Sequence, residues 1–99
     1  MKRGVALLVF VTACAAPIPR PTTADALRAS ATRPTTLAEL ERGREVYVRR
    51  CGNCHQPVQP SEYAPAAWPK HVDDMAERAK LATDDRELIV RFLVTLAAR

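Results

Sequence analysis

Apolar side chains recur every three or four positions in three stretches of the chain, which begin at Thr36, at Trp68 and at Thr83. This spacing is typical of amphipathic helices, and no stretch alternates convincingly between apolar and polar residues as a half-buried strand would. The three stripes are, in order, Leu37, Leu40, Tyr47 and Cys51; Val72, Met75, Ala76 and Ala79; and Leu88, Ile89, Phe92, Leu93 and Leu96. The pattern predicts a compact all-α domain of three main helices over residues 37–99.

Each predicted helix has its own N-terminal signal. Thr36 and Glu39 fit a capping box, in which a hydroxyl and a carboxylate each satisfy an otherwise unpaired backbone amide. Pro69 stands at the first helical position of the second helix, where its missing amide costs nothing. Thr83 is the expected N-cap of the third helix, and the two aspartates after it complement the positive end of the helix dipole.

Gly43 lies inside the first predicted helix, where glycine costs about 1 kcal/mol relative to alanine. A close crossing of another helix would explain this residue, because the missing Cβ lets two backbones approach. A tolerated glycine on the surface agrees equally well with the sequence.

The first 13 residues have the anatomy of a secretory signal. Lys2 and Arg3 are followed by an apolar run over 5–11, and small residues stand directly before Cys14. The run is shorter than the roughly 20 residues that a membrane span needs. Residues 1–13 are therefore predicted to be a signal peptide, which is favoured over a buried N-terminal strand.

The residues Val11-Thr12-Ala13-Cys14 resemble the lipobox of bacterial lipoproteins. The resemblance implies that Cys14 is lipidated and becomes the first residue of the mature chain, so that acyl chains anchor it to a membrane. An ordinary cleaved signal followed by an incidental cysteine is the alternative. The odd number of cysteines favours the lipid, because the other two belong to one motif. Ala15 replaces the aspartate that would resemble an inner-membrane retention signal, which favours the outer membrane.

The next stretch, residues 15–36, is rich in proline, alanine and threonine and has neither a helical stripe nor strand alternation. Such a composition buries too little apolar surface to offset the entropy of ordering. We therefore expect residues 14–36 to be a lipidated cysteine followed by a disordered tether. A short helix over 25–30 would be marginal on its own.

Charge gives no indication of a nucleic-acid partner. The whole chain carries 15 basic and 11 acidic residues, whereas residues 37–99 carry ten of each sign. The excess of positive charge therefore lies outside the predicted domain, and no basic face with interleaved aromatic residues is visible.

The sequence Cys51-Gly52-Asn53-Cys54-His55 is a C-x-x-C-H motif, the signature of c-type haem attachment. Cysteines three positions apart project to one side of a helical turn, so both thiols can form thioethers with one porphyrin. The adjacent His55 can then place an imidazole nitrogen beneath the iron as an axial ligand. One covalent haem c would also supply apolar bulk to a domain of about 63 residues, a size at which a core is marginal.

Three other interpretations of the motif remain open. A redox-active C-x-x-C dithiol belongs to a βαβ setting, which the pattern lacks. A zinc site could use Cys51, Cys54, His55 and His71, and a structural disulfide could join Cys51 to Cys54.

Together these residues resemble the class I cytochromes c, and the resemblance covers roughly residues 37–99. In that family a first helix runs into C-x-x-C-H and is crossed by the last helix at a glycine and aromatic contact, which Gly43, Tyr47 and Phe92 resemble. The resemblance implies that Met75 is the sixth iron ligand, in a Trp-to-Met segment similar to that of certain short bacterial c-type domains. Only 20 residues separate His55 from Met75, which is fewer than in longer relatives, and His71 is a second candidate one helical turn away.

The resemblance implies a one-electron carrier and not an enzyme, because protein ligands would fill both axial positions of the iron. No acid–base pair or activated nucleophile is visible, and the acidic residues at 73, 74, 84 and 85 are interpreted as helix-start and surface charges. Trp68 and Tyr63 could donate to a haem propionate or simply pack. The expected partners are redox proteins and, through the lipid, the periplasmic side of a bacterial membrane. A haem-based sensor and a cytochrome subunit of a larger redox complex are the alternatives.

Overall fold

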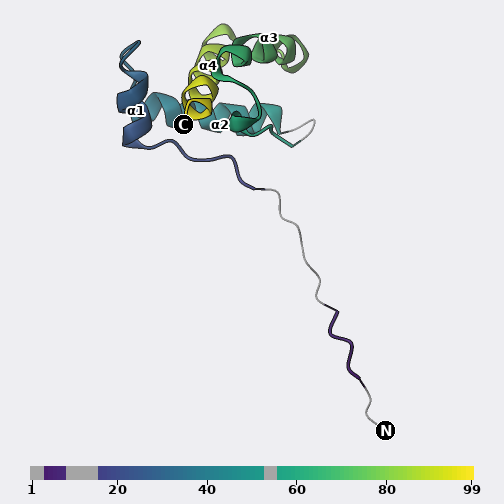
Figure 1. Cartoon of the computed structure of the whole chain (residues 1–99). Coiled ribbons are helices and arrows are strands. Elements are labelled where there is room, and N and C mark those ends of the chain that lie inside the picture. The colour runs from purple at the N-terminus through teal and green to yellow at the C-terminus, as the bar shows by residue number, and fades with distance from the viewer. Residues whose placement is uncertain (1–3, 9–15, 53–55) are drawn as a thin grey trace.

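The computed structural model describes residues 4–8, 16–52 and 56–99, and within these ranges the only regular structure is helical. The described residues form four α-helices: α1 (Thr23–Ala29), α2 (Leu37–Cys51), α3 (Trp68–Ala79) and α4 (Thr83–Ala97). Two short 3₁₀ helices, η1 (Pro60–Glu62) and η2 (Pro65–Ala67), lie between α2 and α3. Figure 1 shows α4 crossing α2, with α3 beyond the crossing and α1 at the opposite end of α2. The prediction of an all-α domain with three main helices is confirmed, and α1 is added to it.

The predicted start of α2 agrees with the structure, and that of α3 is off by one residue. The Thr36 hydroxyl accepts a hydrogen bond from the Glu39 amide at 3.1 Å, and the Glu39 carboxylate accepts one from the Thr36 amide at 3.3 Å. This is the expected capping box. Helix α3 begins at Trp68, one residue before the predicted Pro69, and Pro69 still lies in its first turn, where no backbone donor is needed.

The N-cap of α4 is Ala82, not Thr83, so that prediction is wrong by one residue. Ala82 has an extended backbone, whereas Thr83 is already helical. A capping hydroxyl reaches the free amides of the first turn only from the extended position before the helix, so Thr83 cannot serve as the cap. The two aspartates still lie in the first turn, as expected.

The crossing of α2 and α4 is built on Gly43. A Cβ at this position would overlap the backbone carbonyl oxygen of Leu88 and lie 2.8 Å from the Cβ of Phe92. One turn further along α2, the Tyr47 ring lies 6.3 Å from the Phe92 ring. The interpretation of Gly43 as a close helix crossing is therefore confirmed.

The core lies between α2, α3 and α4 and is dominated by three aromatic side chains. Tyr47, Trp68 and Phe92 are almost completely buried, and the Tyr47 and Trp68 rings meet edge to face at 6.4 Å. Aliphatic residues from the same helices complete this cluster: Val46, Val72, Ile89, Leu93 and Leu96. Burial of this surface supplies the main stabilisation of the domain.

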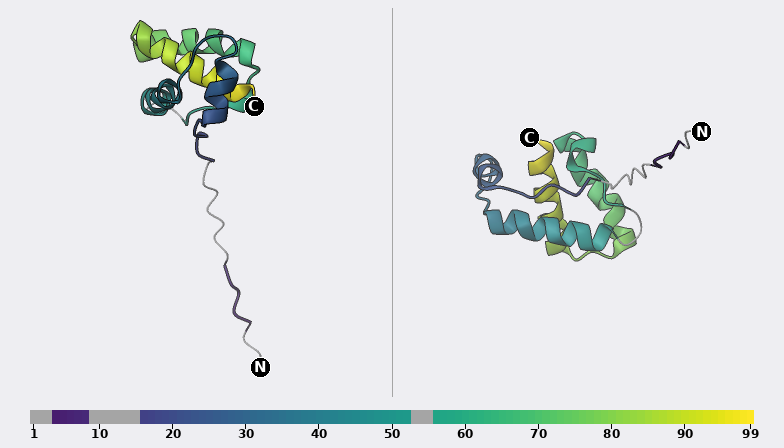
Figure 2. Two further views of the ribbon diagram at one scale, coloured as in Figure 1. Left: turned by 90° about the vertical axis from the view of Figure 1, so that its left-hand side faces the viewer. Right: turned by 90° about the horizontal axis from the view of Figure 1, so that it is seen from below.

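Residues 16–36, which we call the strap, pack on the domain and do not form the expected tether. The Ile18 side chain is buried in the core cluster, and Pro21 is also buried. In the right-hand view of Figure 2, the first part of the strap runs alongside α2 and crosses α4 before the chain enters α1. The composition of the strap suggested disorder, but composition does not reveal the partners that the rest of the chain supplies.

The helix α1 is stabilised by tertiary contacts that a peptide of its length would lack. Thr22 and Asp25 form a capping box, and the Asp25 carboxylate is buried. Arg28 donates a hydrogen bond to this carboxylate at 3.1 Å and a second one to the Thr95 carbonyl at 2.7 Å. The second bond joins α1 to α4.

Residues 4–8 have no regular structure, and the side chains of Val5, Leu7 and Leu8 are more than three-quarters exposed. This part of the apolar run is therefore not a buried strand. Cys14 and the residues on either side of it lie outside the described residues. No helix among the described residues is both long enough and apolar enough to cross a membrane.

Candidate functional site

Cys51 is the last residue of α2, and its side chain is 6% exposed. It belongs to the core cluster together with Tyr47 and Val72. The helical phase of α2, set by the capping box at one end and the Gly43 crossing in the middle, aims this position inward. Cys54 and His55, the other two chemical groups of the motif, lie outside the described residues.

Met75 comes to the same cluster from α3. Its side chain is half-buried and packs against the buried core that contains Cys51 and Val72. The structure therefore places a thiol and a thioether, 24 positions apart in the sequence, in and against one apolar cluster. Both groups lie in apolar surroundings of the kind that a porphyrin face requires.

His71, the competing ligand candidate, has a different environment one turn earlier on α3. Its imidazole stacks on the Tyr63 ring, with centroids 3.9 Å apart and planes inclined by 25°. The Trp68 ring meets the imidazole edge to face at 6.1 Å. These contacts fix the plane of the imidazole against the segment that precedes α3.

Two buried aromatic side chains hold the segment that follows the C-x-x-C-H motif. The Tyr47 hydroxyl donates to the Val58 carbonyl at 2.6 Å, and the Trp68 indole donates to the Pro60 carbonyl at 2.9 Å. Burial raises the pKa of Tyr47 well above its usual range, so its hydroxyl stays protonated and remains a donor.

The bond to Pro60 bears on the role of Trp68. The indole N–H is the only donor of this side chain, and the Pro60 carbonyl accepts it inside the protein. This contact favours packing and positioning for Trp68, and donation to a haem propionate stays a prediction. Tyr63 is 39% exposed and packs edge-on against Trp68, with ring centroids 5.1 Å apart.

Two arginines that the sequence analysis did not identify hold α3 against its neighbours, Arg50 from α2 and Arg86 from α4. Arg50, directly before Cys51, donates to the Ala79 carbonyl at 2.8 Å, so it links the C-terminal ends of α2 and α3. The sequence offered one signal for Arg50. It is a basic residue in the last turn of a predicted helix, a place where arginine side chains often bind backbone carbonyls.

Arg86 of α4 forms an ion pair with Asp73 of α3 and lowers the pKa of that carboxyl through its hydrogen bond. Asp73 was interpreted as a surface charge, and the structure shows it bridging two helices.

Within the described ranges, no three histidine, cysteine, aspartate or glutamate side chains are grouped as they would be around a metal ion. The zinc alternative requires Cys54 and His55, which lie outside these ranges. It therefore stays open, as does the disulfide between Cys51 and Cys54.

Comparisons of this chain with protein-family models, with curated proteins and with solved structures give no match. The resemblance to class I cytochromes c thus depends on the residues of the chain itself. Those residues are the C-x-x-C-H motif, the Gly43 crossing and Met75.

Proposed function

We propose that this protein is a single-haem c-type cytochrome that carries one electron at a time on the periplasmic side of a bacterial membrane. The observation that carries the proposal is the burial of Cys51 in the same apolar cluster that Met75 contacts from α3. Haem attachment and axial ligation need a thiol at the end of a helix and a thioether on another helix bordering the same apolar region.

Four residues would hold the haem. Cys51 and Cys54 would form the thioethers, and His55 and Met75 would be the axial ligands. A haem held in this way supplies reversible one-electron exchange, and a methionine opposite a histidine raises its reduction potential. The described members of the set, Cys51 and Met75, fit this role in burial and chemistry.

The remaining residues of the site position these ligands and exclude water. The α2–α4 crossing at Gly43 sets where α2 ends, and the bond from Arg50 to the Ala79 carbonyl sets where α3 ends. Tyr47 and Trp68 hold the carbonyls of Val58 and Pro60 and fix the path of the segment after the motif. Fixed ligands reduce the rearrangement that accompanies each electron transfer. The axial Met75 prediction is favoured over His71 because the cluster that includes Cys51 contacts Met75, whereas the His71 ring stacks on Tyr63.

We further propose that acyl chains on Cys14 anchor the protein to the membrane, with the outer membrane preferred. The exposed apolar residues 5, 7 and 8 support a signal peptide that is removed on export, because they contribute nothing to the domain. The proposed redox partners are proteins that dock near the haem edge, and no catalytic residue is proposed.

The test begins with protein purified from the membranes of a host that matures c-type cytochromes. Its intact mass should equal that of a chain starting at Cys14 plus one haem and the acyl groups. Oxidised protein should show the far-red sulfur-to-iron charge-transfer band, which should disappear in Met75→Ala and persist in the matched variant His71→Ala. Replacing both Cys51 and Cys54 by alanine should abolish covalent haem.

Three results would contradict the proposal. A purified protein without haem mass would remove the cytochrome assignment altogether. Loss of the low-spin spectrum in His71→Ala, with Met75→Ala unchanged, would assign the sixth position to histidine. Rapid binding of carbon monoxide by the reduced wild-type protein would instead favour a haem-based sensor.

A further inference from the structure

The side chains of Gln59 and Arg44 hold the start of the strap by hydrogen bonds, and we call these contacts the clasp. Gln59 donates a hydrogen bond from Nε2 to the Ala16 carbonyl at 2.8 Å. Arg44 donates from Nε and NH2 to the Ile18 carbonyl, at 3.1 and 2.8 Å. The Ile18 side chain is 7% exposed within the core cluster. The strap is therefore held on the domain from Ala16 onward.

This clasp limits how far the domain can lie from a lipid on Cys14. Only Ala15 separates Cys14 from Ala16 in the sequence. Since neighbouring Cα atoms are 3.8 Å apart, the Cα atoms of Cys14 and Ala16 lie at most about 7.6 Å apart. A flexible tether of the expected length would instead average roughly 25 Å between its ends. A lipidated Cys14 would thus keep the clasp at the membrane surface.

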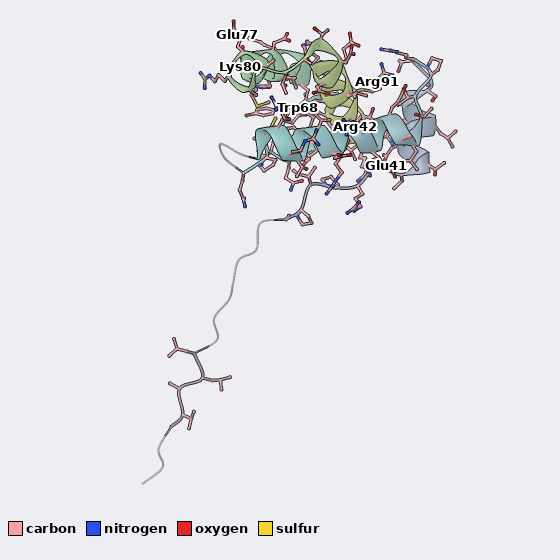
Figure 3. All side chains as sticks on the ribbon, turned by 180° about the vertical axis from the view of Figure 1, so that it is seen from behind. Glu41, Arg42, Trp68, Glu77, Lys80 and Arg91 are labelled. Carbon is pink, nitrogen blue, oxygen red and sulfur yellow. The ribbon has the colours of Figure 1, made fainter. Side chains whose placement is uncertain are left out.

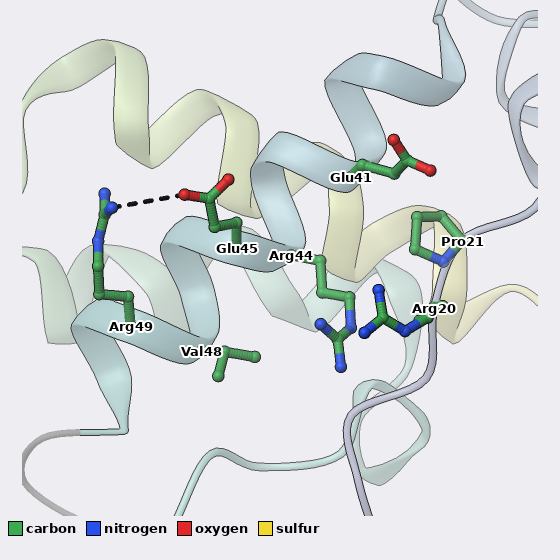
Figure 4. Close-up of a pocket in the computed structure, with 7 residues that line it drawn as sticks. All are labelled: Arg20, Pro21, Glu41, Arg44, Glu45, Val48 and Arg49. Atoms are coloured by element: carbon green, nitrogen blue, oxygen red, sulfur yellow. Dashed lines mark hydrogen bonds and ion pairs between the residues drawn. The ribbon is translucent and has the colours of Figure 1, made fainter.

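The surface beside the clasp has the chemistry to meet phospholipid headgroups. The strap and the outer face of α2 enclose an open cavity of about 530 Å³, shown in Figure 4. Its lining residues are Arg20, Pro21, Glu41, Arg44, Glu45, Val48 and Arg49. Guanidinium groups bind phosphate oxygens through two parallel hydrogen bonds. Three of the seven lining residues are arginines and two are glutamates, so the lining carries a net positive charge. Arg49 pairs with Glu45 and Arg44 donates to the Ile18 carbonyl, which makes Arg20 the guanidinium best placed to meet a phosphate.

We propose that the domain rests directly on the bilayer, with the strap side of α2 against the phospholipid phosphates. The occupant of this surface is the headgroup layer of the membrane that holds the lipid anchor. Gln59, in the segment that follows the C-x-x-C-H motif, then also lies at the membrane surface. This inference rests on the proposed lipidation of Cys14 and extends it from attachment to orientation.

The test compares two cysteine variants on opposite sides of the molecule. Glu45→Cys lies in the cavity beside the strap, whereas Glu77→Cys lies on α3, on the side away from the departing N-terminal chain in Figure 3. Both side chains are exposed, and both variants remove one negative charge. Glu45→Cys also removes the ion pairs with Arg42 and Arg49, so each variant is compared with its own unanchored form, which shares these losses. Each is prepared as the haem-loaded, lipidated protein in phosphatidylethanolamine and phosphatidylglycerol vesicles, and as the unanchored Cys14→Ser form.

The measured quantity is the rate at which a bulky maleimide modifies the added thiol. Anchoring should slow the reaction of Glu45→Cys roughly tenfold, because the reagent reaches the thiol only when the contact opens. The rate for Glu77→Cys should be the same in the anchored and unanchored forms. An insert of about 20 glycine and serine residues between Ala15 and Ala16, spanning roughly 25 Å, should restore the rate at position 45 without releasing the protein.

The outcomes separate this inference from the proposed lipidation. Equal rates for anchored and unanchored Glu45→Cys, in protein whose mass shows acyl groups, would overturn the orientation and leave the lipid anchor standing. Protection of Glu77→Cys instead of Glu45→Cys would also overturn it. Absence of acyl mass on Cys14 would overturn both proposals. A double variant, Arg44→Ala with Gln59→Ala, should raise the rate at position 45 if the clasp sets the orientation.

Discussion

Asp25 and Arg99 lie 74 positions apart in the sequence and form a double hydrogen bond that fastens the strap to the C-terminus. Arg99 donates from Nε to Oδ1 at 3.1 Å and from NH2 to Oδ2 at 2.6 Å. The same guanidinium reaches the Arg20 carbonyl at 2.9 Å. The strap and the last residue of α4's C-terminal extension are thus joined at one buried carboxylate, and we expect that carboxylate to determine the strap's position.

Replacing Asp25 by asparagine should destabilise the domain. The amide keeps the shape of the side chain but removes the charge that Arg99 and Arg28 share, and a buried polar group that loses its partners costs about 1–3 kcal/mol. We expect the melting temperature, measured by circular dichroism, to fall by about 10 °C. Asp74→Asn, at an exposed position on α3, is the control and should change stability by less than about 0.5 kcal/mol. Equal effects of the two substitutions would contradict the role assigned to Asp25.

The same carboxylate should make the domain sensitive to acid. Hydrogen bonds from Arg99, followed by those from Thr22 and Arg28, hold the pKa of Asp25 well below its usual range, although burial opposes this effect. A depressed pKa means that the stabilisation is fully present above the ordinary aspartate value of about 4 and is lost as the pH falls through the folded value. The difference in free energy of unfolding between wild type and Asp25→Asn should therefore shrink below about pH 4. A difference that is constant from pH 7 to pH 2 would contradict this.

Replacing Gly43 by alanine tests the helix crossing, because two physical effects predict opposite changes in the free energy of unfolding. Helix propensity alone predicts that Gly43→Ala stabilises the domain by about 1 kcal/mol. The new Cβ would overlap the Leu88 carbonyl oxygen, which is backbone and cannot rotate away. Overpacking of this kind costs about 1–3 kcal/mol, so we expect net destabilisation in urea unfolding. A gain in stability would mean that α2 and α4 are further apart than the structure shows.

The features that the sequence predicted correctly are local or depend on one unusual residue. The capping box of Thr36 and Glu39 spans a single helical turn, and Gly43 is hard to explain inside a helix without a close neighbour. The strap was missed for the opposite reason, because its stability comes from Arg44, Gln59 and Arg99, which are 26 or more positions away. A second capping box, at Thr22 and Asp25, was visible in the sequence and could have indicated α1.

The candidate site was predictable to a similar degree. The C-x-x-C-H motif named Cys51, and helical periodicity placed Met75 on an apolar stripe, so the burial of Cys51 and the packing of Met75 against its cluster follow from the pattern. Their roles as haem ligands stay predictions. The stacking of His71 on Tyr63 did not follow from the pattern, because it depends on the path of an irregular segment. Backbone carbonyls that accept side-chain bonds, such as those of Val58 and Pro60, leave no mark in a sequence.

The hydroxyl of Tyr47 gives a prediction about that segment. Tyr47→Phe keeps the buried ring and removes only the bond to the Val58 carbonyl, so it should cost about 1–2 kcal/mol in the free energy of unfolding. Tyr63→Phe removes the same atom from a ring that is 39% exposed and should be nearly neutral. Hydrogen exchange at residues 56–60 should also rise in Tyr47→Phe and not in the control. Equal effects of the two variants would show that the Val58 bond does not fix the segment.

The end of α3 offers a substitution that should stabilise the protein. Lys80 has a backbone φ of 50°, a left-handed conformation that glycine adopts without strain and that side chains with a Cβ do not. The turn it forms is a helix C-terminus in which the Leu81 amide donates to the Ala76 carbonyl at 3.1 Å. Lys80→Gly should therefore raise the free energy of unfolding by about 0.5–1 kcal/mol, measured by urea denaturation.

The matched control for that substitution is Glu77→Gly. Glu77 is exposed on the last full turn of the same helix, where its backbone is helical and glycine costs up to about 1 kcal/mol. Glycine should thus raise the free energy of unfolding at position 80 and lower it at position 77, because only position 80 has a left-handed backbone. If Lys80→Gly also lowers stability, α3 does not end in this conformation in solution. The Arg50 bond to the neighbouring Ala79 carbonyl would then need another geometry, and with it the relative placement of Cys51 and Met75.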